Sequence, residues 1–203
     1  MLLTPGPTPV PEFVRKAMSD ITIHHRTEEF EAIFKNTREL LIEIYDMPEV
    51  VILASSGTGA MEACVTNLTH KKALTINSGK FGERFGKICA AFGIDYTEIK
   101  NEWNTPVSVE AVINAIKADS SIDAVFIQIC ESAGGLRHPV EEIAAEIKKI
   151  NKDITIVADG ITAVGVEKID TTNLDAVVTG SQKAFMLPPG LAMIGFSNAA
   201  VAK

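Results

Sequence analysis

DAVFIQI at residues 123–129 and ITIVAD at residues 154–159 are short, almost wholly apolar runs, separated by an amphipathic segment near 140–150. Apolar runs of this length that are rich in Val and Ile are typical of strands buried on both faces of a sheet. The helical segment between them implies a crossover connection, which makes the two strands parallel. This pair therefore predicts an α/β fold with a mostly parallel sheet.

The same alternation of strand and helix extends to both sides of this pair. Further strands are expected at VVILA (50–54), ALTIN (73–77), DYTEI (95–99), DAVVTG (175–180) and LAMIGF (191–196), and helices at about 26–45, 59–69, 80–92 and 108–118. Helices in such crossovers cover both faces of the sheet. Only SQKAFMLPPG joins the last two runs, which is too short for a helical crossover. We therefore expect the final strand to be antiparallel to its predecessor.

The N-terminal part differs from the rest in composition. A Pro-rich leader from Thr4 to Pro11 precedes a short helix with Pro11 near its first turn. We therefore divide the chain into a leader and short helix at 1–20 and one large domain at 21–203. The sequence contains no internal repeat and no low-complexity segment.

Composition and charge exclude several classes of protein. No run approaches the roughly 18 to 20 apolar residues that span a bilayer, and MLLTPGPTPVPEF has no secretory-signal pattern. Three widely spaced cysteines without a CxxC pair indicate a reducing compartment. The net charge is −7 and the Lys and Arg residues are scattered, so no basic stripe is available for nucleic acid. We expect a cytoplasmic protein that binds neither membranes nor nucleic acid.

Ligands of open α/β sheets bind at the carboxyl ends of the strands, so the residues that follow each strand are informative. ASSGTGAMEA at 54–63 follows a strand and opens a helix. Small and hydroxyl residues at a helix N-terminus offer free N–H groups to an anion such as phosphate. Neither the Walker A nor the Rossmann pattern is present. The alternative is an ordinary N-capped turn.

Asp159 ends the apolar run ITIVAD. A carboxylate at the end of a buried strand is costly unless it is paired. One paired use is to bind the protonated nitrogen of a pyridine ring. The alternative is an aspartate that caps a turn or helix.

Lys183 follows the run DAVVTG within TGSQK. Burial lowers the pKa of a lysine, and the neutral amine can form a Schiff base with an aldehyde. The alternative is a lysine whose ammonium reaches solvent.

The histidines have no partners at metal-ligand spacing, so we expect no metal site. The possible phosphate turn at 54–63, Asp159 and Lys183 all lie at the ends of strands, and together they favour a cofactor site.

Several segments together resemble the class V aminotransferases, which depend on pyridoxal 5'-phosphate (PLP), and especially their alanine–glyoxylate and serine–pyruvate group. The segments are TPGPTPVP (4–11), SSGTGAMEA (55–63), NSGKFGER (77–84), VADGITAVG (157–165) and TGSQKAFMLPPG (179–190). The resemblance covers essentially the whole chain. It implies the large, PLP-binding domain of the fold type I transferases.

The resemblance implies catalytic roles for two residues. Lys183 matches the lysine that forms the Schiff base with PLP and moves a proton at the substrate Cα, and Asp159 matches the acid on the pyridine nitrogen. It also implies that Ser56, Gly57 and Thr58 bind the phosphate of the cofactor.

Five more residues receive roles in the same way. Gln182 matches a further phosphate contact, and Phe81 matches the aromatic residue that stacks on the pyridine ring. Ile161 matches the apolar side chain on the other face of the ring, and Ser132 a hydroxyl near its phenolic oxygen. Gly6 matches a backbone position that approaches the substrate.

The chain departs from the family pattern in two places. ESAGG at 131–135 stands where the family reads E-[TS]-S-T-G, so Ala133 and Gly134 replace two hydroxyl residues. The smaller C-terminal domain of the family, which supplies an arginine for the substrate carboxylate, is expected to be absent from this chain. The resemblance also implies a homodimer.

These observations predict an aminotransferase. It would move the amino group of alanine, serine or aspartate to a 2-oxo acid by a ping-pong mechanism. Two alternatives remain. The first is a truncated or non-catalytic PLP-binding chain. The second is a PLP lyase or cysteine desulfurase of the same fold. The desulfurase needs a mobile catalytic cysteine, for which Cys130 is the candidate because Cys64 and Cys89 fall in predicted helices.

Overall fold

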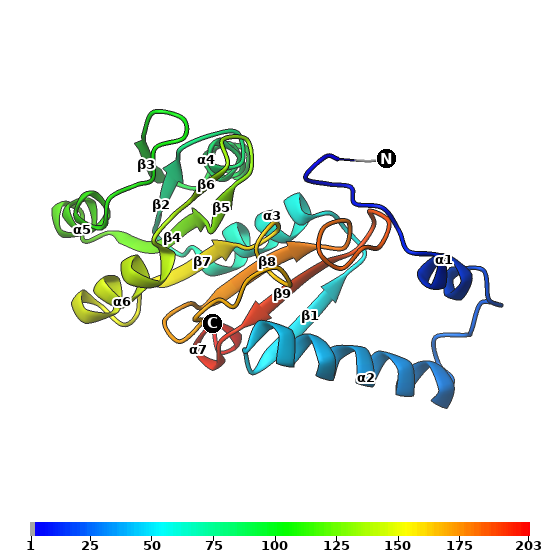
Figure 1. Ribbon diagram of the computed structural model, residues 1–203. Coiled ribbons are helices and arrows are strands. Elements are labelled where there is room, and N and C mark those ends of the chain that lie inside the picture. The colour runs from blue at the N-terminus through cyan, green and yellow to red at the C-terminus, as the bar shows by residue number, and fades with distance from the viewer. Residues whose placement is uncertain (1–2) are drawn as a thin grey trace.

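A computed structural model describes residues 3–203 and contains a seven-stranded sheet with the strand order β1-β9-β8-β7-β4-β2-β3 (Figure 1). The strands are β1 (Glu49–Leu53), β2 (Lys72–Asn77), β3 (Tyr96–Lys100), β4 (Ile122–Gln128), β7 (Thr155–Asp159), β8 (Ala176–Gly180) and β9 (Ala192–Phe196). Each predicted apolar run coincides with a strand to within one residue at either end. The predicted α/β fold with a mostly parallel sheet is confirmed.

The last strand, β9, runs antiparallel to both of its neighbours, β8 and β1. The loop between β8 and β9 is held by Ser181, whose N–H donates to Leu191 O at 2.9 Å and whose hydroxyl donates to Pro188 O at 2.6 Å. The predicted antiparallel direction is therefore confirmed. Its insertion between β1 and β8 was not predicted from the sequence.

Helices cover both faces of the sheet, as predicted (Figure 1). The helices are α1 (Glu12–Met18), α2 (Glu28–Tyr45), α3 (Gly57–Leu68), α4 (Gly82–Phe92), α5 (Val109–Ala118), α6 (Val140–Ile150) and α7 (Asn198–Val201). One face packs against α3 and α4, and the other against α5, α6 and the end of α2. The sequence did not predict α7 or the small hairpin of β5 (Cys130–Glu131) and β6 (Leu136–Arg137).

The central strands are buried on both faces because their side chains alternate between two cores. In β4, Phe126 packs with Phe85 of α4, ring centroids 5.1 Å apart, whereas Val125 and Ile127 belong to the opposite core. Full burial of one such side chain contributes about 2 kcal/mol. The two cores make the sheet a firm support for residues that leave its carboxyl end.

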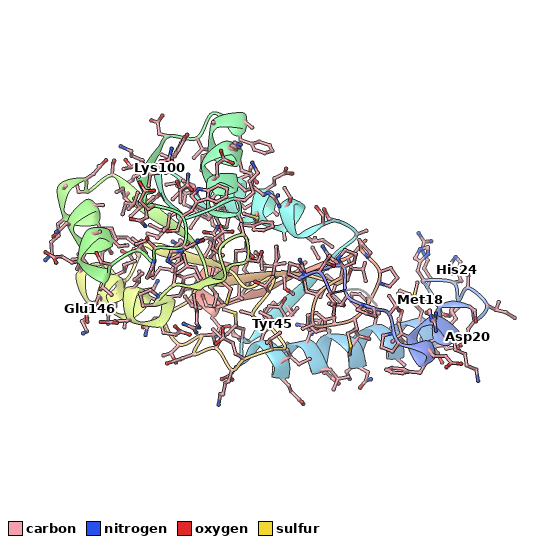
Figure 2. All side chains as sticks on the ribbon, turned by 45° about the horizontal axis from the view of Figure 1, so that its top comes forward. Met18, Asp20, His24, Tyr45, Lys100 and Glu146 are labelled. Carbon is pink, nitrogen blue, oxygen red and sulfur yellow. The ribbon has the colours of Figure 1, made fainter. Side chains whose placement is uncertain are left out.

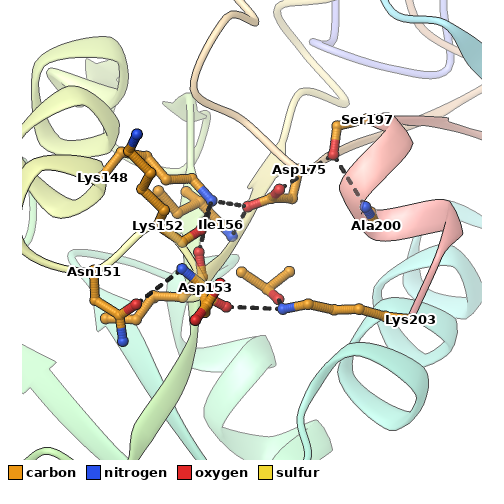
Figure 3. Close-up of polar contacts among 11 residues, drawn as sticks. Lys148, Asn151, Lys152, Asp153, Ile156, Asp175, Ser197, Ala200 and Lys203 are labelled. Atoms are coloured by element: carbon orange, nitrogen blue, oxygen red, sulfur yellow. Dashed lines mark hydrogen bonds and ion pairs between the residues drawn. The ribbon is translucent and has the colours of Figure 1, made fainter.

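The amino ends of β7 and β8 are joined by a polar network around Asp175 (Figure 3). Its carboxylate accepts hydrogen bonds from Lys148 Nζ at 2.7 Å and from Ile156 N at 2.8 Å, and a weaker one from Ser197 Oγ at 3.2 Å. Because Asp175 is buried, loss of one partner of this ion pair would cost about 3–5 kcal/mol. This network lies at the end of the sheet opposite to Asp159.

The leader and α1 make few contacts with the core. Figure 2 shows Met18, Asp20 and His24 in a segment that extends beyond the sheet, whereas Tyr45 lies against it. The predicted short helix is confirmed as α1, although none of its residues is buried. Within residues 3–203, no helix combines the length and the apolar character needed to cross a bilayer.

Candidate active site

A small pocket lies at the carboxyl ends of β2, β4, β7 and β8. Its lining side chains come from the ends of these strands and from the segments that follow: Phe81, Cys130, Ser132, Asp159, Ile161, Thr162 and Lys183. Five of the seven had been predicted as site residues on separate segments of the sequence. The parallel strands bring them together because their carboxyl ends share one edge of the sheet.

Asp159 is the last residue of β7 and is 4% exposed. One carboxylate oxygen accepts a hydrogen bond from Ile161 N at 2.9 Å. Burial raises the pKa of Asp159 to about 6, Glu131 adds to this effect, and Arg84 and Lys183 oppose it. A positively charged partner would relieve the cost of this buried carboxylate. The site is therefore suited to a cationic group on the ligand.

Lys183 lies three residues beyond β8 and is partly buried. Its amine donates a hydrogen bond to Pro5 O at 3.2 Å, and no carboxylate within residues 3–203 lies in ion-pair distance. Burial lowers the pKa of Lys183, and Asp159 partly opposes this. A lowered pKa increases the fraction of neutral amine, which is the nucleophilic form.

Gly6 of the leader lies directly against Lys183. A Cβ atom at Gly6 would be 2.4 Å from Lys183 Nζ, far inside van der Waals contact. The leader is fastened here by Thr8, whose N–H donates to Gln182 O at 3.0 Å and whose hydroxyl donates to Lys183 O at 2.8 Å. The structure therefore brings Gly6 to the site, as the resemblance predicted, and adds Thr8, for which the sequence carries no signal.

The predicted phosphate turn opens α3. Ser56 caps the helix through a hydrogen bond from Gly59 N to its Oγ at 3.3 Å. Gly57 packs so closely on the pocket residue Ile161 that a Cβ atom would lie 2.4 Å from Ile161 Cδ1. The free N–H groups of the helix start beside the pocket, where they suit an anion. Ser56, Gly57 and Thr58 thus flank the pocket without lining it.

Arg84 is a charged residue at this turn that the sequence did not single out. Its Nη1 donates to Thr58 Oγ1 at 2.9 Å, and its guanidinium carbon lies 4.9 Å from the centroid of the Phe81 ring. Within residues 3–203, Arg84 forms no ion pair with a carboxylate. The only signal in the sequence was its place in the segment FGER. It adds a positive charge beside the predicted phosphate turn.

Gln182, like the predicted phosphate turn, does not line the pocket. Its Oε1 is buried and has no hydrogen-bond partner among residues 3–203. A buried amide oxygen without a partner is costly. The predicted phosphate contact of Gln182 stays a prediction.

Cys130 lines the pocket, but its thiol is not activated. Burial raises the pKa of Cys130, and nearby Glu167, whose Oε1 is 3.8 Å from the sulfur, raises it further. Burial also raises the pKa of Cys64 to about 12 and of Cys89 to about 11. A nucleophilic cysteine needs a lowered pKa. None of the three thiols of this chain therefore meets the requirement of the desulfurase alternative.

The residues of the pocket fit PLP. Asp159 is a buried carboxylate that forms no ion pair within residues 3–203, and Lys183 is an amine with a lowered pKa that lines the same pocket. Phe81 and Ile161 provide apolar surfaces. A wider pocket of about 540 Å³ lies next to the smaller one, and Ser132 and Lys183 are among the residues that line both. It gives a small substrate a way to Lys183.

Comparisons with known proteins identify the family of the chain. A model of the family described as "Aminotransferase class-V" matches residues 2–203. An uncharacterized aminotransferase of Helicobacter pylori J99 is 51% identical over 201 residues, which are 99% of this chain and 54% of the relative. L-aspartate–glyoxylate aminotransferase of Paracoccus denitrificans is 31% identical over 98% of this chain and 52% of its own.

The fold agrees equally well with solved structures. Aspartate aminotransferase of subgroup IV from Thermus thermophilus superimposes with a TM-score of 0.91 at 31% identity, over 98% of this chain and 57% of that one. The chain thus spans about half the length of its relatives. Because the match covers its sequence, its sheet and the segments around the pocket, the chain belongs to the class V aminotransferase family.

Proposed function

We propose that this protein is a PLP-dependent aminotransferase, which transfers an amino group between an amino acid and a 2-oxo acid. The observation that carries the proposal is the meeting of Asp159 and Lys183 in one pocket, each with a pKa shifted by burial. Membership of the class V family supports the same reaction.

The residues that would hold PLP follow from the site. Ser56, Gly57 and Thr58 would bind its phosphate at the start of α3, with Gln182 as a further contact. Asp159 would accept a hydrogen bond from the ring nitrogen and keep it protonated. When bound, PLP supplies an electron sink for negative charge at the substrate Cα.

The remaining residues would position the ring and move protons. Phe81 and Ile161 would enclose the two faces of the ring, and Ser132 would donate to its phenolic oxygen. The amine of Lys183, released from Pro5 O, would bind the cofactor covalently with loss of water. Once the amino group of the substrate has displaced it from the cofactor, the free amine would accept a proton from the substrate Cα. Gly6 would leave room for the substrate beside that amine.

Alanine, serine and aspartate are the candidate amino donors that the sequence left open. Aspartate and glyoxylate are the first pair to test, because a relative with 31% identity is named L-aspartate–glyoxylate aminotransferase. An inert PLP-binding chain stays the second candidate, as in the sequence analysis. A half-reaction separates them: an active chain converts bound PLP to its amine form when aspartate is added.

We also propose a homodimer. The long helix α2 exposes apolar side chains that a partner would cover: Ile33, Phe34, Leu40 and Ile44, each between 44% and 51% exposed. Light scattering during size-exclusion chromatography measures the mass directly. A mass of one chain at micromolar concentration would refute the dimer.

A cytoplasmic location is proposed on the state of the cysteines. Cys64, Cys89 and Cys130 are all free thiols. Free thiols persist in a reducing compartment. Cell fractionation with an antibody against the protein tests this location.

The first experiment on function is addition of PLP, followed by borohydride reduction and peptide mapping. A pyridoxyl group on Lys183, absent after Lys183→Ala, is the expected result. Turnover retained by Lys183→Ala, or reduction that labels other lysines equally, would refute the proposal.

A further inference from the structure

We infer that Glu131 is a positioning residue that holds the Phe81 ring and the Ser132 segment in place at the pocket. The inference rests on the proposed function, since these two residues are assigned there to the ring of PLP. Neither the family match nor the predicted site residues gave Glu131 a role.

The carboxylate of Glu131 is fully buried and accepts three backbone hydrogen bonds. Oε2 accepts from Phe81 N at 2.9 Å and from Gly82 N at 2.8 Å, whereas Oε1 accepts from Ala133 N at 3.1 Å. The contact is so close that a Cβ atom at Gly79 would lie 2.5 Å from Glu131 Cγ. One side chain thus joins the start of α4 to the loop after β5.

Gln128 holds the same residue from its other side. It is fully buried, and its Nε2 donates to Phe81 O at 3.0 Å. Both backbone polar groups of Phe81 are therefore bound by buried side chains from one stretch of chain, β4 and β5. Phe81 is the residue before the first turn of α4. The hydrogen bonds to its N–H and its carbonyl oxygen therefore fix its backbone so that its ring points to the pocket.

The chemistry requires a carboxylate at residue 131. An ionised carboxylate accepts hydrogen bonds at both oxygens, whereas an amide has one acceptor and one donor. After Glu131→Gln, an NH₂ group would face either the N–H groups of Phe81 and Gly82 or that of Ala133. The positive end of α4 further favours the negative charge. The isosteric amide therefore breaks the link without leaving a cavity.

The test compares affinity for PLP and amide exchange in the full chain. Glu131→Gln is expected to raise the Kd for PLP by about tenfold, corresponding to about 1.4 kcal/mol. It is also expected to accelerate hydrogen exchange at the Phe81 and Gly82 amides without PLP. Asp175→Asn is the matched control, because it removes another buried carboxylate that accepts a backbone N–H. It should lower Tm while leaving the Kd within about twofold.

A double-mutant cycle shows whether Glu131 acts through Phe81. Phe81→Ala removes the ring, so Glu131→Gln should then weaken PLP binding by much less than in the parent. If the effects of the two substitutions on the free energy of PLP binding simply add, the inference is overturned. An unchanged Kd in Glu131→Gln would overturn it as well. If Glu131→Gln does not fold, Gln128→Leu removes the bond to Phe81 O and should also raise the Kd.

Failure of the inference is distinguishable from failure of the proposed function. A parent chain that does not bind PLP refutes the proposed function, while the exchange rates of the two amides still test the hold on Phe81. A parent chain that binds PLP, with normal exchange in Glu131→Gln, refutes only the inference.

Discussion

The amine of Lys183 lies 3.2 Å from the carbonyl oxygen of Pro5 and donates a hydrogen bond to it. The leader, far from Lys183 in sequence, therefore lies directly over the residue that we propose as the catalytic amine. Figure 1 shows the leader beside the loop that follows β8. This relationship makes the leader part of the site.

Gly6→Val should impair the site more than the fold. A side chain at Gly6 cannot coexist with Lys183 Nζ, 2.4 Å from the position of a Cβ, so the leader or the lysine must move. We expect covalent attachment of PLP at Lys183 to slow by about tenfold or more, while Tm changes by a few degrees at most. Thr4→Ala, an exposed change in the same leader, is the control. Equal attachment rates in the two variants would contradict the prediction.

Asp159→Asn should stabilise the chain without PLP and abolish turnover. The pKa of Asp159 is raised from 3.8 to about 6, so the folded chain binds its proton more tightly than the unfolded chain. Its contribution to stability is present below pH 4 and is lost as the pH rises to 6, by up to about 3 kcal/mol. Urea unfolding at pH 4 to 7 should show that the free energy of unfolding of the variant, relative to that of the parent, increases as the pH rises. Parallel curves would contradict the raised pKa.

His138 should have the opposite effect on acid stability. It is buried, its Nδ1 accepts from Val107 N at 3.1 Å, and burial lowers its pKa from 6.5 to about 4. Its contribution to stability is fully present above pH 6.5 and falls by up to about 3 kcal/mol as the pH falls to 4. In the parent, this loss and the gain from Asp159 largely cancel. The free energy of unfolding of His138→Gln, measured with urea, should therefore rise as the pH falls, because only the contribution of Asp159 remains. The same pH dependence in variant and parent would refute the assignment.

Arg84→Met should weaken the binding of PLP but not of pyridoxal, which lacks the phosphate. The guanidinium lies at Thr58 of the proposed phosphate turn and forms no ion pair within residues 3–203 that would neutralise it. Loss of a charge-assisted contact corresponds to a rise in Kd of about tenfold. Lys80→Met removes a nearby cation that is paired with Glu83, and it serves as the control. Equal losses for PLP and pyridoxal would show that Arg84 does not act on the phosphate.

By itself, the sequence determined the elements and their chemistry. Apolar runs such as those ending at Asp159 and Gly180 read as strands because burial on both faces requires such residues. The short loop after β8 required an antiparallel β9. Asp159 and Lys183 could be picked out because Asp159 ends one of these runs and Lys183 comes three residues after the other. This closeness in sequence also placed both residues at the carboxyl end of the sheet.

Only the tertiary structure decided which distant side chains meet. The insertion of β9 next to β1, the hold of Glu131 on Phe81, and the contacts of Arg84 with Thr58 and of Pro5 with Lys183 all join segments far apart in the sequence. Local periodicity reports which face of an element is apolar, but it does not contain the order of the strands. That order sets which loops are neighbours, and it is selected by the packing of the whole sheet and its two layers of helices.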